Sequence, residues 1–88
     1  MSYLYAAMRS HVFTEGGQVM FLKIRDRTAR LLDEAGAAML QNMISGNTGD
    51  SWLMLACVDR MVELGEIREV TDPETVMGQH RVFVRGRQ

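Results

Sequence analysis

Cysteine is scarce in this sequence, because Cys57 is the only one among 88 residues. A single thiol cannot close an internal disulfide, and it does not supply a multi-thiolate metal site. Chains without disulfides are typical of a reducing compartment. We therefore expect a cytoplasmic protein.

Long apolar segments are missing too. No run approaches the ~20 consecutive apolar residues that a membrane-spanning helix requires, and residues 1–8 lack the basic start and apolar centre of a secretory signal. Neither sign of charge is in excess, because 10 basic and 11 acidic side chains give a formal net charge of -1. We expect no membrane partner, and any contact with phosphate must depend on local clusters of cations.

Motifs for catalysis are also missing. No sequence signal ties Cys57 to His11 or His80, and the pair Asp33-Glu34 has no apolar setting that would raise a carboxyl pKa. No glycine-rich phosphate loop with a following lysine is present. We therefore expect neither enzymatic activity nor a metal, a cofactor or a small-molecule substrate.

What the chain does contain is enough apolar material, 47% of its residues, for one compact domain over residues 1–88. A chain of this length buries only roughly 60–65% of its unfolded surface, so self-association would add useful stabilisation. The eight methionines are interpreted mainly as core residues, because thioether side chains fill irregular spaces.

The segments on either side of Gly16-Gly17 allow two interpretations. Residues 11–15 and 18–24 flank the two glycines, which supply the positive φ angles of a tight turn, so the pattern predicts an N-terminal β-hairpin. The alternative is a helix over residues 18–32, since Lys23, Arg27, Arg30 and Glu34 lie on one stripe at helical spacing. Residues 2–8 fit either a short helix or a strand.

Three helices are predicted next. Asp26 can cap a helix over residues 26–35 that ends at Gly36, with a second helix over residues 37–44; one helix interrupted at Gly36 is the alternative. Residues 45–50 have the composition of a turn, and Asp50 or Ser51 can cap a third helix, which ends at residue 64 with Gly65 as its left-handed stop.

At 100° per residue, the third helix has a broad inward side and a narrower outward side. The outward side carries Asp59, Arg60 and Glu63, and it continues toward the helix start with Ala56 and Trp52. The first half is therefore apolar on all sides, and either the N-terminal hairpin or a partner must cover it. The inward residues are Met54, Cys57, Val58, Met61, Val62 and Leu64.

A two-stranded ribbon is predicted at the C-terminal end, over residues 66–71 and 80–85. Asp72-Pro73-Glu74 starts the connection and Gly78 closes it. Glu66 opposite Arg85, with Ile67 opposite Val84, gives a favourable register.

Residues 58–70, VDRMVELGEIREV, resemble the end of the third helix and the start of the wing in the winged-helix superfamily. The resemblance covers about residues 26–85 and implies an α+β fold of three helices with a C-terminal β-ribbon as wing. In that superfamily the third helix usually enters the major groove of DNA, and the wing touches the backbone. Carried over by position, Arg60 is the one cation among the groove-facing residues, which are Ser51, Trp52, Leu53, Ala56, Asp59 and Arg60.

These patterns predict two alternative functions. The first is a small binding module that acts through protein contacts, by self-association or by docking on a partner, because exposed aromatic and methionine side chains are enriched at interfaces. Trp52 can instead pack under the N-terminal hairpin as an ordinary core residue. The predicted interface consists of Trp52, Leu53, Ala56, Val76 and Met77.

The second function is a DNA-binding transcriptional regulator that uses the C-terminal ribbon and a basic helix stripe. Asp26 and Asp33 flank that stripe, which is also typical of a solvated helix face with an Asp26–Arg30 pair. The candidate nucleic-acid residues are Lys23, Arg27, Arg30, Arg60, Arg68, His80, Arg81, Arg85 and Arg87.

Overall fold

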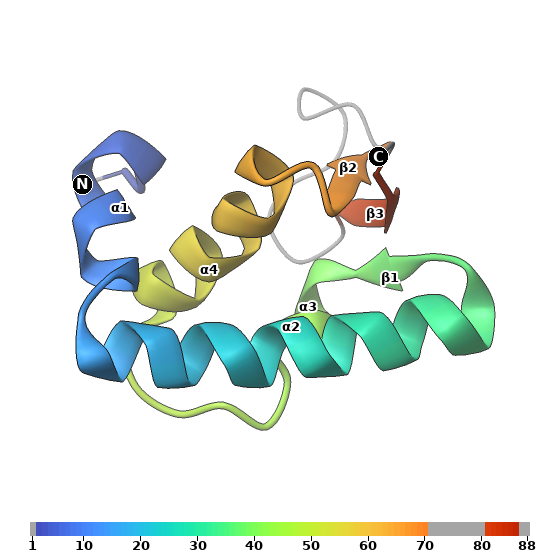
Figure 1. The fold of residues 1–88 in the computed structure, drawn as a ribbon, viewed down its shortest axis with the longest axis horizontal. Helices are drawn as coiled ribbons and strands as arrows, with labels where there is room; N and C mark the ends of the chain where they lie inside the picture. The colour runs from blue at the N-terminus through green and yellow to red at the C-terminus, as the bar shows by residue number, and fades with distance from the viewer. Residues whose placement is uncertain (1, 71–80, 87–88) are drawn as a thin grey trace.

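The computed structural model describes residues 2–70 and 81–86, and this part of the chain holds four helices and a three-stranded antiparallel sheet (Figure 1). The expected α+β class is confirmed. The helices are α1 (Tyr5–Val12), α2 (Glu15–Ala35), α3 (Leu40–Ile44) and α4 (Ser51–Glu63), and the strands are β1 (Ala38–Met39), β2 (Ile67–Glu69) and β3 (Val82–Arg85).

The predicted N-terminal hairpin is wrong, because the segments around Gly16-Gly17 are helical. Neither glycine has a positive φ angle. Thr14 caps α2 instead, since its hydroxyl oxygen accepts a hydrogen bond from the Gly17 N–H at 3.0 Å. A Cβ at residue 17 would lie 2.0 Å from the carbonyl oxygen of His11, so Gly17 is needed for the close approach of α1 to α2.

The alternative interpretation, a helix through residues 18–32, is confirmed, and α2 extends beyond it at both ends. The helix presents Phe21, Ile24, Thr28 and Leu32 to the core at helical spacing. Asp26 therefore lies inside the helix and does not cap it. Gly36 does end the helix as predicted, with φ of 75° and its N–H bound to the carbonyl oxygen of Leu32 at 2.8 Å.

The second predicted helix, residues 37–44, is only partly correct. Its first residues form β1, which pairs Ala38 with Phe83 and Met39 with Val82, and only Leu40–Ile44 is helical. The Leu40 N–H also donates to the carbonyl oxygen of Arg81 at 2.8 Å. Pairing with β3 supplies hydrogen bonds that this short segment would otherwise lack, so β1 joins the ribbon in a sheet of order β1-β3-β2.

The antiparallel ribbon itself is confirmed, but its register is shifted by one residue from the prediction. Ile67 lies opposite Arg85, and Glu66 falls outside the strand, where its carbonyl oxygen accepts a hydrogen bond from the Gly86 N–H at 2.9 Å. A Cβ at residue 86 would lie 2.0 Å from the carbonyl oxygen of Gly65, so glycine permits this contact. The predicted turn at residues 72–78 and the outermost strand residues, Thr71 and His80, lie outside the described residues.

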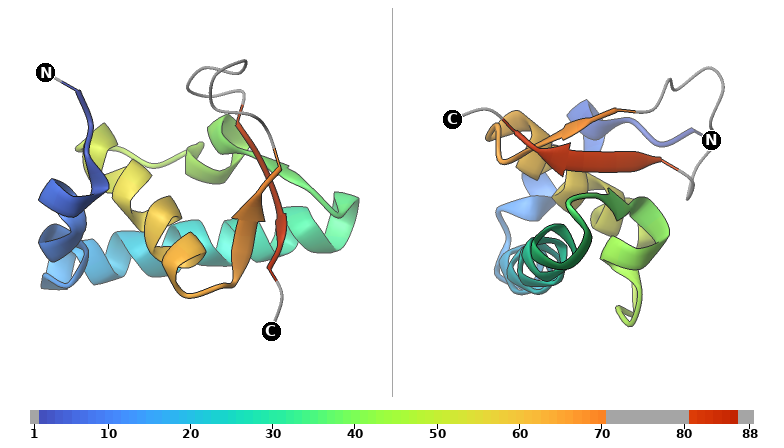
Figure 2. Two further views of the ribbon diagram at one scale, coloured as in Figure 1. Left: turned by 90° about the horizontal axis from the view of Figure 1, so that it is seen from above. Right: turned by 90° about the vertical axis from the view of Figure 1, so that its right-hand side faces the viewer.

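The core lies where α4 crosses over α2, and Figures 1 and 2 show α4 between α1 and the sheet. The interpretation of methionines as core residues is confirmed for Met43, Met54 and Met61, which are buried. Phe83 is fully buried where the central strand meets the helices. No helix in the described ranges has the length and apolar character needed to cross a membrane.

Candidate functional site

Helix α4 forms largely as its sequence predicts. The Asp50 carboxylate accepts a hydrogen bond from the Trp52 N–H at 2.9 Å, and Gly65 has φ of 76°. The inward residues Met54, Cys57, Val58 and Met61 are buried, as expected. Val62 and Leu64 are not, at 37% and 43% exposure, because Met61 takes the inward position in the last turn and Val62 lies about 100° around the helix from it.

The outward side of α4 is not a free surface. Ala56, predicted as an interface residue, is fully buried at 0% exposure. This prediction was wrong because α1, which the sequence did not clearly reveal, packs along α4. The residues preceding α1 take part as well, since the Tyr3 hydroxyl donates to Asp59 Oδ2 at 2.5 Å. The helix side that would face a DNA groove by the winged-helix resemblance is therefore covered by the N-terminal segment.

Glu63 is the centre of the contacts between α1 and α4. The Arg9 guanidinium binds its carboxylate at 2.9 and 3.1 Å, the Tyr5 hydroxyl donates to it at 2.8 Å, and Arg60 Nη1 lies at 2.7 Å. These donors, Arg9 first, lower the pKa of Glu63 to about 2. Burial and the bond to Glu63 raise the pKa of Tyr5 to about 12.

A second polar network joins the N-terminal segment to the sheet. Arg81 forms two hydrogen bonds with the Glu69 carboxylate, at 2.8 and 2.9 Å, and its Nη2 lies 3.8 Å from Asp59 Oδ1. The bonds to Glu69 raise the pKa of Arg81. Burial, together with the bond to Asp59, raises the pKa of Tyr3. Because Arg81 already binds carboxylates of its own chain, its guanidinium is less available to bind phosphate.

The other predicted interface residues are either partly buried or outside the described residues. Leu53 packs partly against the core, and Trp52 is half-buried. Val76 and Met77 lie outside the described residues, as do His80 and Arg87 among the predicted basic residues. The described members therefore do not combine into one exposed apolar face on α4.

The remaining predicted cations fall into two groups. Arg60 lies 4.9 Å above the Phe13 ring in addition to its bond with Glu63, and Arg85 pairs with Asp33. The predicted Asp26–Arg30 pair is confirmed at 3.3 Å. Within the described ranges, by contrast, no carboxylate partner is found for three cations, which are Lys23, Arg27 and Arg68.

Lys23 lines a small hollow of about 200 Å³ between α2 and the loop before α4, together with Gly46, Asn47 and Thr48. Arg27, one helical turn further along α2, donates from Nε to the carbonyl oxygen of Asn42 at 2.5 Å. This edge of α2 therefore keeps most of its positive charge available to solvent.

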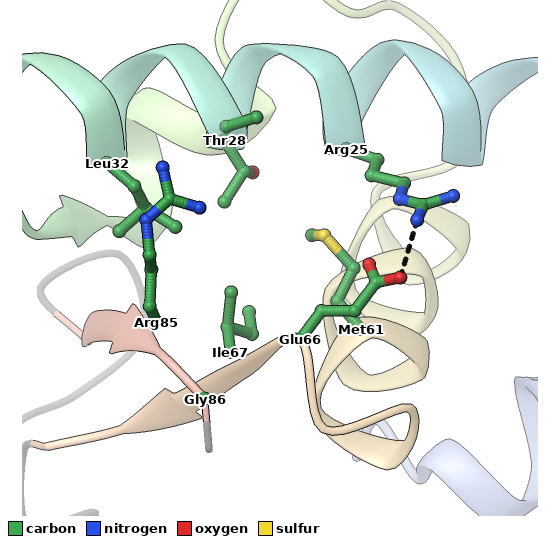
Figure 3. A pocket seen from close by; sticks show the side chains of 9 residues that line it. Arg25, Thr28, Leu32, Met61, Glu66, Ile67, Arg85 and Gly86 are labelled. Atoms are coloured by element: carbon green, nitrogen blue, oxygen red, sulfur yellow. Dashed lines mark ion pairs between the residues drawn. The ribbon is translucent and has the colours of Figure 1, made fainter. Parts of the chain in front are cut away.

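A pocket of about 350 Å³ lies between α2 and the β2–β3 ribbon (Figure 3). Its apolar side chains include Leu32, Met61 and Ile67. Arg25, paired with Glu66 at 2.7 Å, stands at one end, and Arg85 stands at the other. Sequence reasoning missed this pocket because its walls come from one helix, the end of another and two strand ends.

Cys57 is fully buried, and burial raises the pKa of its thiol to about 11. Such a thiol is a poor nucleophile at neutral pH. Among the residues that the structure describes, no three His, Cys, Asp or Glu side chains are grouped so that they could hold a metal ion.

Comparisons with protein-family models, with curated proteins and with solved structures find no match for this chain.

Proposed function

We propose that this chain is a winged-helix-like module that works by binding another protein chain, a second copy or a different partner, rather than by catalysis. Support for the fold comes from the element order, in which α2, α3 and α4 precede a ribbon in the order expected of three helices and a wing. The strand β1 adds to the ribbon and ties it to the helices.

The observation that carries the protein-contact proposal is an apolar stripe on the outer side of α2. Val19 and Leu22 are 52% and 57% exposed, and their spacing of three residues places them on one helix face. The core-facing side of the same helix is occupied by Phe21 and Ile24. Apolar side chains that lie together on an exposed surface are typical of interaction sites.

This stripe replaces α4 as the preferred interface. Covering a leucine or valine side chain that water now reaches is worth up to about 1.5–3 kcal/mol each. The outer side of α4 exposes less apolar surface that a partner could cover, because Ala56 is already buried there and Trp52 is half-buried.

Support for protein over DNA comes from charge. The side of α4 that would face DNA by the winged-helix resemblance carries Asp59 and Glu63, two carboxylates that would repel phosphate. Several candidate cations, Arg60, Arg81 and Arg85, are engaged with carboxylates of the same chain.

The test compares the wild type with Leu22→Glu by size-exclusion chromatography with light scattering over a wide range of concentrations. Ala6→Glu, an exposed helix position on α1, is the matched control. We expect the apparent mass to rise with concentration in the wild type and in Ala6→Glu, but not in Leu22→Glu. A wild type that stays monomeric would exclude self-association. Docking on another protein would then require a partner that binds Ala6→Glu normally and Leu22→Glu poorly.

DNA binding is the second candidate, and the observation that favours it is the unneutralised charge of Lys23, Arg27 and Arg68. Binding through phosphate contacts weakens steeply as salt rises, and each lost contact lowers the slope by about one. A mobility assay across salt concentrations, with wild type and the double variant Lys23→Gln/Arg27→Gln, separates the two functions. A steep slope that decreases by about two in the double variant would support DNA binding.

A further inference from the structure

The pocket between α2 and the ribbon combines an apolar floor with charged ends. Thr28, Leu32, Met61 and Ile67 line its floor, and each of them is at most 5% exposed. The Thr28 hydroxyl is satisfied, since it donates to the carbonyl oxygen of Ile24 at 2.7 Å. The floor therefore presents no unpaired polar group. The volume of the pocket, about 350 Å³, falls at the lower end of the ~300–1,000 Å³ typical of small-molecule sites.

The two arginines at the ends of the pocket differ in how firmly they are held. The Arg25–Glu66 pair is shielded on the glutamate side, with 21% of that side chain exposed. The Arg85–Asp33 pair is open to water, with 57% and 70% of the two side chains exposed. Exposed ion pairs add little to stability. Arg85 can therefore exchange Asp33 for another carboxylate at small cost, whereas Arg25 and Glu66 form a fixed wall.

We propose that this pocket binds a small organic monocarboxylate with an aromatic or branched aliphatic body. The planar guanidinium of Arg85 would bind the two carboxylate oxygens side by side. The apolar body would lie on Leu32, Met61 and Ile67, as the view in Figure 3 allows. Glu66 lines the same space, so an anion with two negative charges is disfavoured by repulsion. This ligand site goes beyond the protein contact through Val19 and Leu22 and does not depend on it.

The probes are phenylacetate, its neutral amide and inorganic phosphate, each titrated into the full chain while backbone amide signals are followed by NMR. Phenylacetate is expected to shift the signals of Thr28, Ile67 and Gly86. The neutral amide should bind about tenfold more weakly, because it loses a charge-assisted contact. Phosphate should leave these signals unchanged, because it gains nothing from the apolar floor.

Two substitutions are expected to change the affinity for phenylacetate in opposite directions. Arg85→Gln should weaken phenylacetate binding about tenfold, whereas Asp33→Asn should tighten it several-fold by freeing Arg85 from its competing carboxylate. Asp26→Asn is the matched control, because Asp26 is an equally exposed aspartate of α2 paired with a different arginine, Arg30. It should leave the affinity unchanged.

The proposal is overturned if phenylacetate does not shift the pocket signals, or if phosphate shifts them as strongly. Equal effects of Asp33→Asn and Asp26→Asn would also overturn it, since only Asp33 faces Arg85. If Arg85→Gln folds poorly, its loss of binding is uninformative. Asp33→Asn still tests the proposal, because it is expected to bind phenylacetate more tightly. Loss of self-association in Leu22→Glu with normal phenylacetate binding would show that the two sites are separate.

Discussion

Replacing Gly17 by alanine is expected to break the contact between α1 and α2. A Cβ at this position would lie 2.0 Å from the carbonyl oxygen of His11 and 2.8 Å from that of Val12, and both atoms belong to the backbone. Side-chain rotation cannot relieve this contact, so the end of α1 must move away from α2. Val12, fully buried at the end of α1, would move with it.

The magnitude follows from two opposing effects. Overpacking typically costs about 1–3 kcal/mol, and contact with rigid backbone places this case near the upper value. Alanine in a helix gains up to about 1 kcal/mol over glycine. The net loss of stability for Gly17→Ala is therefore about 2 kcal/mol, which corresponds to a decrease in melting temperature of roughly 8–16 °C for a chain of this size.

Gly16 supplies a neighbouring control. It lies in the same first turn of α2, but a Cβ there has nothing within 4 Å. Gly16→Ala should be neutral or more stable by up to about 1 kcal/mol. Urea unfolding followed by circular dichroism measures both variants, and hydrogen exchange reports whether α1 is released. If Gly17→Ala proved as stable as Gly16→Ala, the close approach of α1 to α2 would be refuted.

Three further predictions concern titration and reactivity. The pKa of Glu63 is lowered to about 2 from 4.5, so its contacts stabilise the fold above pH ~4.5 and lose this effect as the pH falls toward 2; urea midpoints measured across that range should lose this pH dependence in Glu63→Gln. The pKa of Tyr5 is raised to about 12 from 10.0, so its contribution is present below pH ~10 and is lost as the pH rises toward 12; Tyr5→Phe should remove one high-pH phenolate transition from the ultraviolet titration. Cys57 is buried with its pKa raised to about 11, so a thiol reagent should modify the native chain at neutral pH only as fast as the chain opens, and rapid labelling without denaturant would contradict this burial.

Helix α4 and the ribbon could be predicted from the sequence because their signals are local. The Asp50 carboxylate caps the backbone directly after it, and Gly65 adopts the left-handed conformation that ends the helix. The same holds for Gly36 at the end of α2. Each of these signals acts over a few residues, so no knowledge of the rest of the fold is needed.

The N-terminal half was harder because Gly16-Gly17 has two local meanings. Two glycines suit a tight turn, but they also permit close contact between helices, and only the position of the His11 carbonyl group decides between these meanings. Strand β1 has just two residues, and it exists through its pairing with β3. A helical wheel likewise placed Ala56 on the outward side of α4, but it could not show that α1 packs along this helix.

The candidate sites likewise depend on contacts between distant parts of the chain, which local sequence patterns do not reveal. Arg81 looks like a free cation in the sequence, yet Glu69, 12 residues earlier, binds it with two hydrogen bonds. The pocket at Arg85 could not be predicted, because α2, α4 and both ribbon strands contribute to it.

The sequence by itself determined where α2 and α4 stop, which side of α4 is mainly apolar, and that positive charge is not in excess. Those properties depend on a residue and its near neighbours. Tertiary structure alone decided which charges are neutralised, which apolar side chains stay exposed, and where a pocket opens. These outcomes depend on contacts between segments far apart in the chain, such as Arg9 with Glu63 and Asp33 with Arg85, and local patterns do not encode such contacts.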